Sequence, residues 1–254
     1  MNSLAPGTWI SACQARPEAT LRLICFPYAG ANASVFRPWA SHFPESIELH
    51  AVRLARRTAK TEPRVDDRLS AVVQELSHAI QHDIPGPFAF FGHSLGALLA
   101  FEIARDMNHR HIPGPLCLFL SGRRAPQLPP DSSPIHDLPT NAFLRELKDL
   151  NGTPPEILEN AELMEVFLPI LRSEIRLAET HVHRSSAPLT CPITVFGGKQ
   201  DDAISRNALV AWRENTRGAF ALRMFPGDHF FIHSSESEVA QAIQTDLAYL
   251  GRDL

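Results

Sequence analysis

One serine of the chain stands in a context that is typical of a catalytic nucleophile. Ser94 lies in GHSLG, between Gly92 and Gly96, after the apolar run PFAFF and before the amphipathic segment LGALLAFEIA. In G-x-S-x-G between a strand and a helix, the serine occupies a sharp turn, and the glycines remove side chains that would collide there. The amide of Leu95, at the helix start, would point toward a developing oxyanion. We therefore predict Ser94 as nucleophile and Leu95 as one oxyanion donor.

A serine nucleophile of this kind needs a histidine base and an acid, which follow it in the order serine, acid, histidine. Of the 12 histidines, only His229 and His233 follow the last-but-one predicted strand and its loop. His229, in the loop segment FPGDHFFI, suits a base, whereas His233 is expected as a polar residue at or near the start of the final helix. The segment GGKQDD supplies Asp201 and Asp202 as candidate acids. Asp228 is a weaker candidate, because an immediate neighbour rarely turns back to hold the imidazole.

A second oxyanion donor is expected in the loop FPYAGANASVF, which follows the first long predicted strand. Gly30 makes this backbone permissive, and the small residues around it let a substrate carbonyl approach. We predict the amide of Ala29 as the second donor.

The elements that must position these residues alternate between strands and helices. Apolar runs such as LRLICFPY, PFAFFGHS and PITVFGG read as buried parallel strands, and RLSAVVQELSHAI and SEVAQAIQTDLAYL read as amphipathic helices. This alternation predicts an α/β fold with a mostly parallel, doubly wound sheet. Residues 125–187 contain helical patterns without a strand signal, so we expect a helical lid insertion there. The length favours a single domain over residues 1–254.

Composition excludes several other classes of function. Twenty-four Lys and Arg against 28 Asp and Glu give a net charge of −4, which argues against a broad basic surface for nucleic acid. No stretch resembles an export signal or a membrane span, so the sequence predicts a cytoplasmic protein without membrane attachment. The four cysteines are far apart and form no CxxC group, which favours unpaired thiols and gives no indication of a metal site.

The motifs together resemble a narrower family. CFPYAGANASVF, VRLARRTAKTEP, FFGHSLGALLAFEIA, FGGKQDD and FPGDHFFI are similar, in this order, to type II thioesterases of nonribosomal peptide and polyketide synthases. The resemblance implies an α/β-hydrolase that removes acyl, aminoacyl or peptidyl groups from the phosphopantetheine arm of carrier proteins, which clears stalled or misprimed synthase modules. It also implies a triad of Ser94, Asp201 and His229, with Asp201 favoured over Asp202. No cofactor or metal of its own is implied, because the partner carries the pantetheine group.

The chain departs from the family pattern at three places. Ala55, Arg56 and Arg57 stand where relatives usually have Pro-Gly-Arg, Ala31 replaces a usual glycine, and Asp228 replaces the glycine before the histidine. Carrier proteins are acidic in such systems, so arginines would favour encounter with them. We predict Arg56 and Arg57 as possible carrier-docking residues, within a larger set that includes Arg53, Arg64, Arg68, Arg123 and Arg124; a merely solvated face is the alternative.

The lid would cover the site and shape an acyl tunnel. Its possible lining residues are Phe143, Leu144, Leu147, Leu163, Val166, Phe167 and Leu171.

Two other functions fit the motifs less closely. A carboxylesterase or acyltransferase on the same scaffold would turn over small oxygen esters, and a noncatalytic binding protein of this fold would leave Ser94 unreactive.

Overall fold

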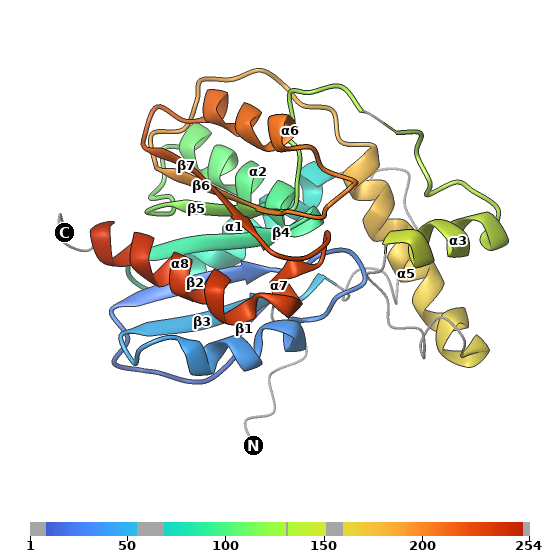
Figure 1. Cartoon of the computed structure of the whole chain (residues 1–254). Coiled ribbons are helices and arrows are strands. Elements are labelled where there is room, and N and C mark those ends of the chain that lie inside the picture. Colours follow the sequence, from blue (N-terminus) through green and yellow to red (C-terminus); the bar gives the residue numbers. More distant parts are fainter. Residues whose placement is uncertain (1–8, 55–68, 131, 151–159, 251–254) are drawn as a thin grey trace.

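A seven-stranded sheet forms the centre of the computed structural model, which describes residues 9–54, 69–130, 132–150 and 160–250. The strand order is β1-β3-β2-β4-β5-β6-β7, and all neighbours are parallel except β1 and β3 (Figure 1). The strands are β1 (Ile10–Ala12), β2 (Leu21–Phe26), β3 (Ile47–Val52), β4 (Phe88–His93), β5 (Leu118–Ser121), β6 (Ile193–Gly198) and β7 (Phe220–Phe225).

The parallel strands β2, β4 and β6 coincide with the apolar runs that predicted buried strands. Every residue of β4, β5 and β6 is buried, because helices cover both faces of the sheet and leave no solvent side for polar residues. The edge strand β1 was not predicted. It has only three residues, which is too few for an alternating pattern to be recognised, and it pairs antiparallel with β3 through Ile10 and Val52.

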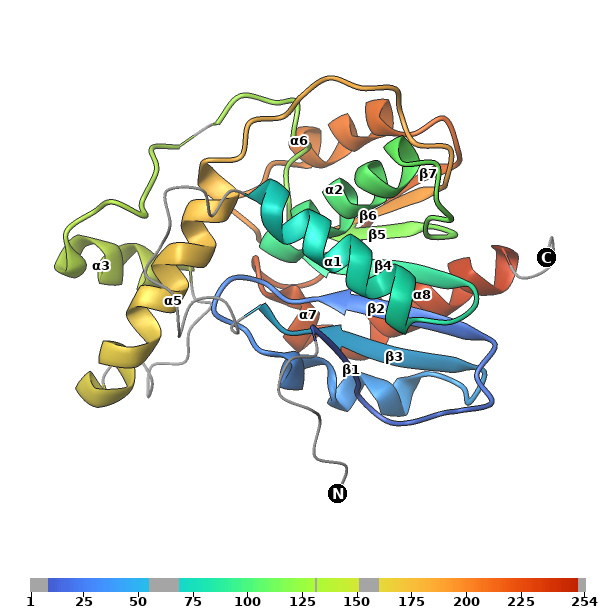
Figure 2. The same ribbon diagram turned by 180° about the vertical axis from the view of Figure 1, so that it is seen from behind.

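Helices cover the two faces of the sheet. One face carries α1 (Leu69–Asp83), α2 (Leu95–His109), α6 (Arg206–Val210) and the 3-10 helix η4 (Ala211–Asn215). The other carries the 3-10 helices η1 (Ala33–Phe36) and η2 (Pro38–His42), with α7 (Phe231–Ser234) and α8 (Glu236–Leu250). Figures 1 and 2 show these layers from opposite sides.

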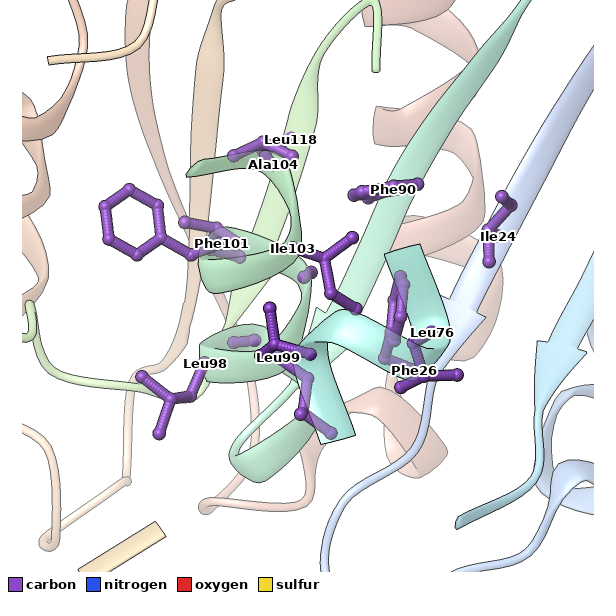
Figure 3. Packing of buried hydrophobic residues seen from close by; sticks show 14 of the residues in the cluster. Ile24, Phe26, Leu76, Phe90, Leu98, Leu99, Phe101, Ile103, Ala104 and Leu118 are labelled. Carbon is purple, nitrogen blue, oxygen red and sulfur yellow. The ribbon is translucent and has the colours of Figure 1, made fainter. Parts of the chain in front are cut away.

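The larger core cluster lies between α1, α2 and the central strands. Figure 3 shows Ile103 of α2 and Leu76 of α1 close to Phe26 and Phe90, which belong to neighbouring strands. The rings of Phe26 and Phe90 meet edge to face with their centroids 5.1 Å apart. Burial of this apolar surface is the main stabilising contribution, and it fixes α2 firmly against the sheet.

In the described part of the segment expected as an insertion, between β5 and β6, the structure has two further helices. They are α3 (Thr140–Leu150) and α5 (Ala161–Glu179), and both views place them beyond one end of the sheet (Figures 1 and 2). Asn160 caps α5 by accepting a hydrogen bond from the Leu163 amide at 3.1 Å.

Two chemical features of the chain bear on its class. The four cysteines are free thiols, as their spacing predicted, and Cys25 and Cys117 are buried. None of the helices in the described ranges is both long enough and apolar enough to cross a membrane.

The first turn of α2 approaches the end of β2 more closely than any side chain permits. A Cβ atom built on Gly96 would lie 2.0 Å from the carbonyl oxygen of Phe26 and 2.7 Å from that of Pro27. Both obstacles are backbone atoms, so a side-chain rotation cannot relieve the overlap. Glycine at this position therefore sets the distance between the nucleophile-bearing helix and the sheet.

Replacing Gly96 by alanine should destabilise the protein by about 3 kcal/mol or more, because the helix must move away from its packed position. Gly114→Ala is the matched control, since nothing lies within 4 Å of an added Cβ there. That control should change the free energy of unfolding by less than about 0.5 kcal/mol. Urea denaturation followed by circular dichroism measures both, and equal stabilities would contradict the packing argument.

Candidate active site

Ser94 occupies the turn between β4 and α2 in a backbone conformation that is rare for residues other than glycine. Its φ is 53° and its ψ is −112°. Such a conformation costs about 1–3 kcal/mol and is kept only where the surroundings enforce it. Here the neighbouring glycine contributes, because a Cβ on Gly92 would lie 2.2 Å from the carbonyl oxygen of Gly96. The Ser94 amide also donates to the Ser121 carbonyl at 2.8 Å, which ties the turn to β5.

The predicted acid and base form a direct pair on the loops after β6 and β7. His229 Nδ1 lies 2.8 Å from Asp201 Oδ2, and the two side chains are 13% and 2% exposed. Because a carboxylate only accepts hydrogen bonds, the imidazole carries its proton on Nδ1 and leaves Nε2 able to take one.

The second oxygen of Asp201 is also used. Asp201 Oδ1 accepts from the amides of Ala203 at 2.9 Å and Ile204 at 3.1 Å. These bonds hold the buried carboxylate in one orientation toward the imidazole. The geometry thus gives the base a fixed tautomer and a partner for its cation.

The residue that precedes Ser94 in the sequence lies beside the candidate base. The ring of His93 lies 5.1 Å from the ring of His229, centroid to centroid. Within the described ranges, no hydrogen bond involves Ser94 Oγ, so its contact with the base is not closed in this structure. Serine-to-histidine hydrogen bonds are often long without substrate, so this geometry is compatible with the expected role.

His93 was not singled out from the sequence, although the structure places it beside the candidate base. It is fully buried, and its Nδ1 lies 2.9 Å from Ser121 Oγ. Burial, reinforced by the nearby histidines His229 and His233, lowers the pKa of His93 well below its ordinary value. His93 is therefore neutral at physiological pH and adds no positive charge beside the base.

The two predicted oxyanion donors come from different elements. Leu95 is the first residue of α2, and Ala29 lies in the loop after β2. Neither amide donates a hydrogen bond to another residue in the described part of the chain. Both are available to an incoming oxygen, although their pairing around one oxyanion remains a prediction.

The alternatives to this triad have other contacts. Asp202 is exposed, and Asp228 Oδ1 accepts from the Phe230 amide at 2.8 Å in its own turn. His233 lies in α7, just before the final helix, and its Nε2 is 3.0 Å from the hydroxyl of Tyr28. The structure places the Asp201 carboxylate within hydrogen-bonding distance of His229 Nδ1.

The lid residues divide into a buried and an exposed group. Phe143, Leu147 and Leu171 form a small buried cluster, against which Leu144 and Phe167 pack. Leu163 and Val166 were expected to line an acyl tunnel, but they are 51% and 71% exposed. That expectation is wrong for these two residues. They lie on α5, but the contacts of this helix with the loop after β2 are made by Phe167, Leu171 and Glu174.

A buried carboxyl group on α5 lies beside the loop that carries Ala29. Glu174 is 2% exposed, and its Oε2 accepts a hydrogen bond from the Gly30 amide at 2.7 Å. Burial raises the pKa of Glu174 to about 7, against the smaller opposing effect of that hydrogen bond. The sequence showed only a polar residue in a helical pattern, so this contact was not foreseen.

The arginines that the sequence predicted as docking candidates lie in two separate segments, 53–68 and 123–124. Arg56, Arg57, Arg64 and Arg68 lie outside the described residues. Arg123 donates from Nη2 to the carbonyl oxygen of Ala178 on α5 at 3.0 Å, and both Arg123 and Arg124 are half-buried. That pair therefore does not form an exposed basic rim.

One cluster of the described residues has the composition of a metal site. Ligand atoms of Glu102, His181 and His183 lie within 4.8 Å of one another. However, Arg105 Nη1 already binds both oxygens of Glu102, at 2.8 and 2.9 Å. A cation would have to displace or tolerate this guanidinium group, so the cluster fits an ion-pair network better than a metal centre.

Together, the fold and these side chains define the class of protein. A mostly parallel sheet carries a strained serine between a strand and a helix, followed in chain order by an aspartate and a histidine at later strand ends. This is the arrangement of an α/β-hydrolase.

Comparison with known proteins narrows the class to a family. A family model described as thioesterase domain matches residues 21–247. The chain belongs to this thioesterase family and is a thioester hydrolase, which confirms the activity predicted from its motifs. The gramicidin S biosynthesis protein GrsT of Aneurinibacillus migulanus is 40% identical over 233 residues, which cover 92% of this chain and 91% of that protein.

Solved structures agree with this assignment. ClbQ from the colibactin NRPS/PKS pathway has a TM-score of 0.85 and 31% identity, covering 93% of this chain and 100% of that chain. The type II thioesterase BorB from the borrelidin biosynthetic cluster has a TM-score of 0.82 and 31% identity, and the match covers 93% of this chain and 96% of that chain. The resemblance to type II thioesterases that the sequence motifs indicated is thereby confirmed.

The contact between Asp201 and His229 predicts different effects for the two neighbouring aspartates. Asp201→Asn should lower kcat on the order of a thousandfold or more, because an amide at this position favours the wrong imidazole tautomer and cannot balance the imidazolium charge. Asp202→Asn should stay within about twofold of the wild type, since that side chain is exposed. Steady-state hydrolysis of a pantetheine thioester measures both, and the reverse ranking would move the acid to Asp202.

The buried acid on α5 predicts a pH dependence of stability. The folded-state pKa of Glu174, about 7, lies above the ordinary value of 4.5. Its contribution to stability is therefore fully present below about pH 4.5 and is lost as the pH rises through 7. The Gln side chain of Glu174→Gln cannot ionise. The free energy of unfolding of this variant, relative to that of the wild type, should therefore increase between pH 5 and 8, by up to about 3 kcal/mol. Urea denaturation across this range tests it; a constant difference would contradict the prediction.

Proposed function

We propose that the chain hydrolyses acyl, aminoacyl or peptidyl thioesters on the phosphopantetheine arm of carrier proteins, and so releases stalled or misprimed groups from a synthase. The observation that carries the catalytic part is the buried Asp201–His229 pair, which lies at strand ends beside the turn of Ser94. Support for the substrate comes from relatives that are named for gramicidin S biosynthesis and for a colibactin NRPS/PKS pathway.

In this proposal, acylation begins at Ser94. Its Oγ attacks the thioester carbonyl carbon, and its proton passes to Nε2 of His229, while Asp201 stabilises the resulting imidazolium. The carbonyl oxygen becomes an anion that accepts hydrogen bonds from the amides of Ala29 and Leu95. When the tetrahedral intermediate collapses, the C–S bond breaks and the imidazolium returns its proton to the departing thiolate.

Deacylation repeats these steps with water. His229 takes a proton from a water molecule that attacks the acyl-serine ester, and the second tetrahedral intermediate uses the same two amides. Its collapse breaks the bond to Ser94 Oγ, which regains a proton from the imidazolium, and the free acid leaves. No cofactor is needed for these steps, because the pantetheine group belongs to the carrier protein.

The lid and the docking surface belong to the same proposal. Helices α3 and α5 would cover the acyl group. The lining candidates that remain without the two exposed residues are Phe143, Leu144, Leu147, Phe167 and Leu171. Arg56 and Arg57 are proposed as carrier-docking residues on the basis of the sequence alone.

A substrate panel with a Ser94→Ala control tests the proposed function. The same acyl group should be presented on a carrier protein, on free pantetheine and as a simple oxygen ester. We expect carrier-bound thioesters to have the highest kcat/KM, because the partner adds binding interactions that are absent from the small substrates. Ser94→Ala should fold normally and lose activity by a factor on the order of a thousand or more.

Two outcomes would overturn the proposal. Retention of a tenth of the wild-type rate by Ser94→Ala would remove the nucleophile assignment. A wild-type enzyme that prefers oxygen esters over the carrier-bound thioester would instead be a carboxylesterase. A fluorophosphonate probe that labels the wild type, but not Ser94→Ala, identifies the reactive serine independently of the substrate.

A further inference from the structure

Helix α5 crosses the loop after β2 at atomic contact. A Cβ atom on Gly30 would lie 2.9 Å from both Leu171 Cδ1 and Phe167 Cζ, so the helix side chains rest directly on the loop backbone. Gly30 also has a φ of +82°, which other residues rarely adopt. Glycine is thus required here both by conformation and by the closeness of α5.

The loop forms a tight turn in this region. The amide of Ala31 donates to the carbonyl oxygen of Tyr28 at 3.0 Å, which closes a four-residue turn with Ala29 and Gly30 at its centre. A positive φ at the third position is characteristic of a type II turn. In such a turn the central peptide group, which contains the Gly30 amide, can adopt an alternative orientation, as in a type I turn.

Glu174 holds this central peptide group. Its carboxyl oxygen accepts from the Gly30 amide at 2.7 Å, across 144 positions of sequence, and its side chain is buried. Burying a carboxyl group is costly unless its contacts compensate. Arg172, two residues before it on α5, is engaged elsewhere, because its Nη1 donates to the His136 carbonyl and its guanidinium stacks on the Phe143 ring. The hydrolytic steps above do not use this acid either.

We propose that Glu174 is a positioning residue for the oxyanion loop, because its carboxyl group fixes the Gly30 amide and thereby the backbone at Ala29. The peptide group before Ala29 is held through the Tyr28 carbonyl, and the peptide group after it is held through the Gly30 amide. With both neighbours fixed, the Ala29 amide keeps one direction. This role rests on the proposed function, since Ala29 matters only as an oxyanion donor.

The location of Glu174 on α5 gives the contact a second consequence. The helix that covers the site and the loop that stabilises the oxyanion are linked by one short hydrogen bond. Any displacement of α5 that breaks this bond also frees the peptide group beside Ala29. The lid and the oxyanion hole are therefore mechanically coupled.

The test compares two substitutions at Glu174. Glu174→Met keeps a similar side-chain length and removes the acceptor, whereas Glu174→Gln keeps an oxygen that can accept from Gly30. We expect Glu174→Met to lower kcat on a free pantetheine thioester by tenfold to about a hundredfold, less than the loss of a whole oxyanion donor. Its KM should change by less than about threefold, and Glu174→Gln should restore most of kcat.

Glu179 provides the matched control on the same helix. Its carboxylate accepts from the amides of Ile135 at 2.9 Å and His136 at 3.1 Å, so it also binds backbone amides but does not touch the oxyanion loop. Glu179→Met should reduce the unfolding temperature and leave kcat within about threefold of the wild type. The rate of inactivation by a fluorophosphonate should fall with kcat in Glu174→Met, because the phosphonyl oxygen occupies the same oxyanion site.

Equal losses of kcat in Glu174→Met and Glu179→Met would overturn the positioning role. It would also be overturned if Glu174→Gln folds but is no more active than Glu174→Met. If Glu174→Met does not fold, Glu174→Asp gives the same comparison, since it withdraws the carboxyl group by one methylene. The proposed function has a separate test. It fails if the wild-type enzyme hydrolyses no thioester and the fluorophosphonate does not label its Ser94. An active, labelled wild type with an unaffected Glu174→Met disproves the positioning role alone.

Discussion

The close approach of α2 to the sheet is the constraint on which the rest of the site depends. Two positions in the turn around Ser94 have no room for a side chain, because backbone carbonyl groups fill the space on both sides. The helix can then begin immediately after the strand, with Ser94 in a strained conformation that raises its hydroxyl above the sheet. The energy that maintains this strain comes from the apolar surface that α2 buries between α1 and the central strands.

Beside this rigid turn, Asp201 and His93 are both buried but have different polar surroundings. Asp201 is almost fully buried but has three hydrogen-bond donors around its two oxygens, so it can keep its charge away from water. His93 is buried without a charged partner and is held neutral. The base beside them therefore meets one negative charge on one side and an uncharged ring on the other, an arrangement that favours the imidazolium formed during the reaction.

Much of the fold and the core of the site could be predicted because their sequence signals are local. Buried parallel strands appear as apolar runs, and Ser94, Asp201 and His229 each follow a parallel strand. Strand β1 was missed because three residues carry no recognisable period. Leu163 and Val166 were misplaced because an amphipathic pattern shows which residues share a helix face, but not how much of that face is covered. Glu174 was missed because its partner lies 144 positions away.

The chemistry of Glu174 explains why an acid can stand so near an oxyanion site. A fully ionised carboxylate beside Gly30 would repel the negative charge that develops on the substrate oxygen. Burial raises the pKa of this group to about 7, so near neutral pH a large fraction of it is uncharged. An uncharged carboxyl group still offers its carbonyl oxygen to the Gly30 amide. The same burial that packs α5 against the loop thus lets Glu174 hold the peptide group while it limits the electrostatic opposition to catalysis.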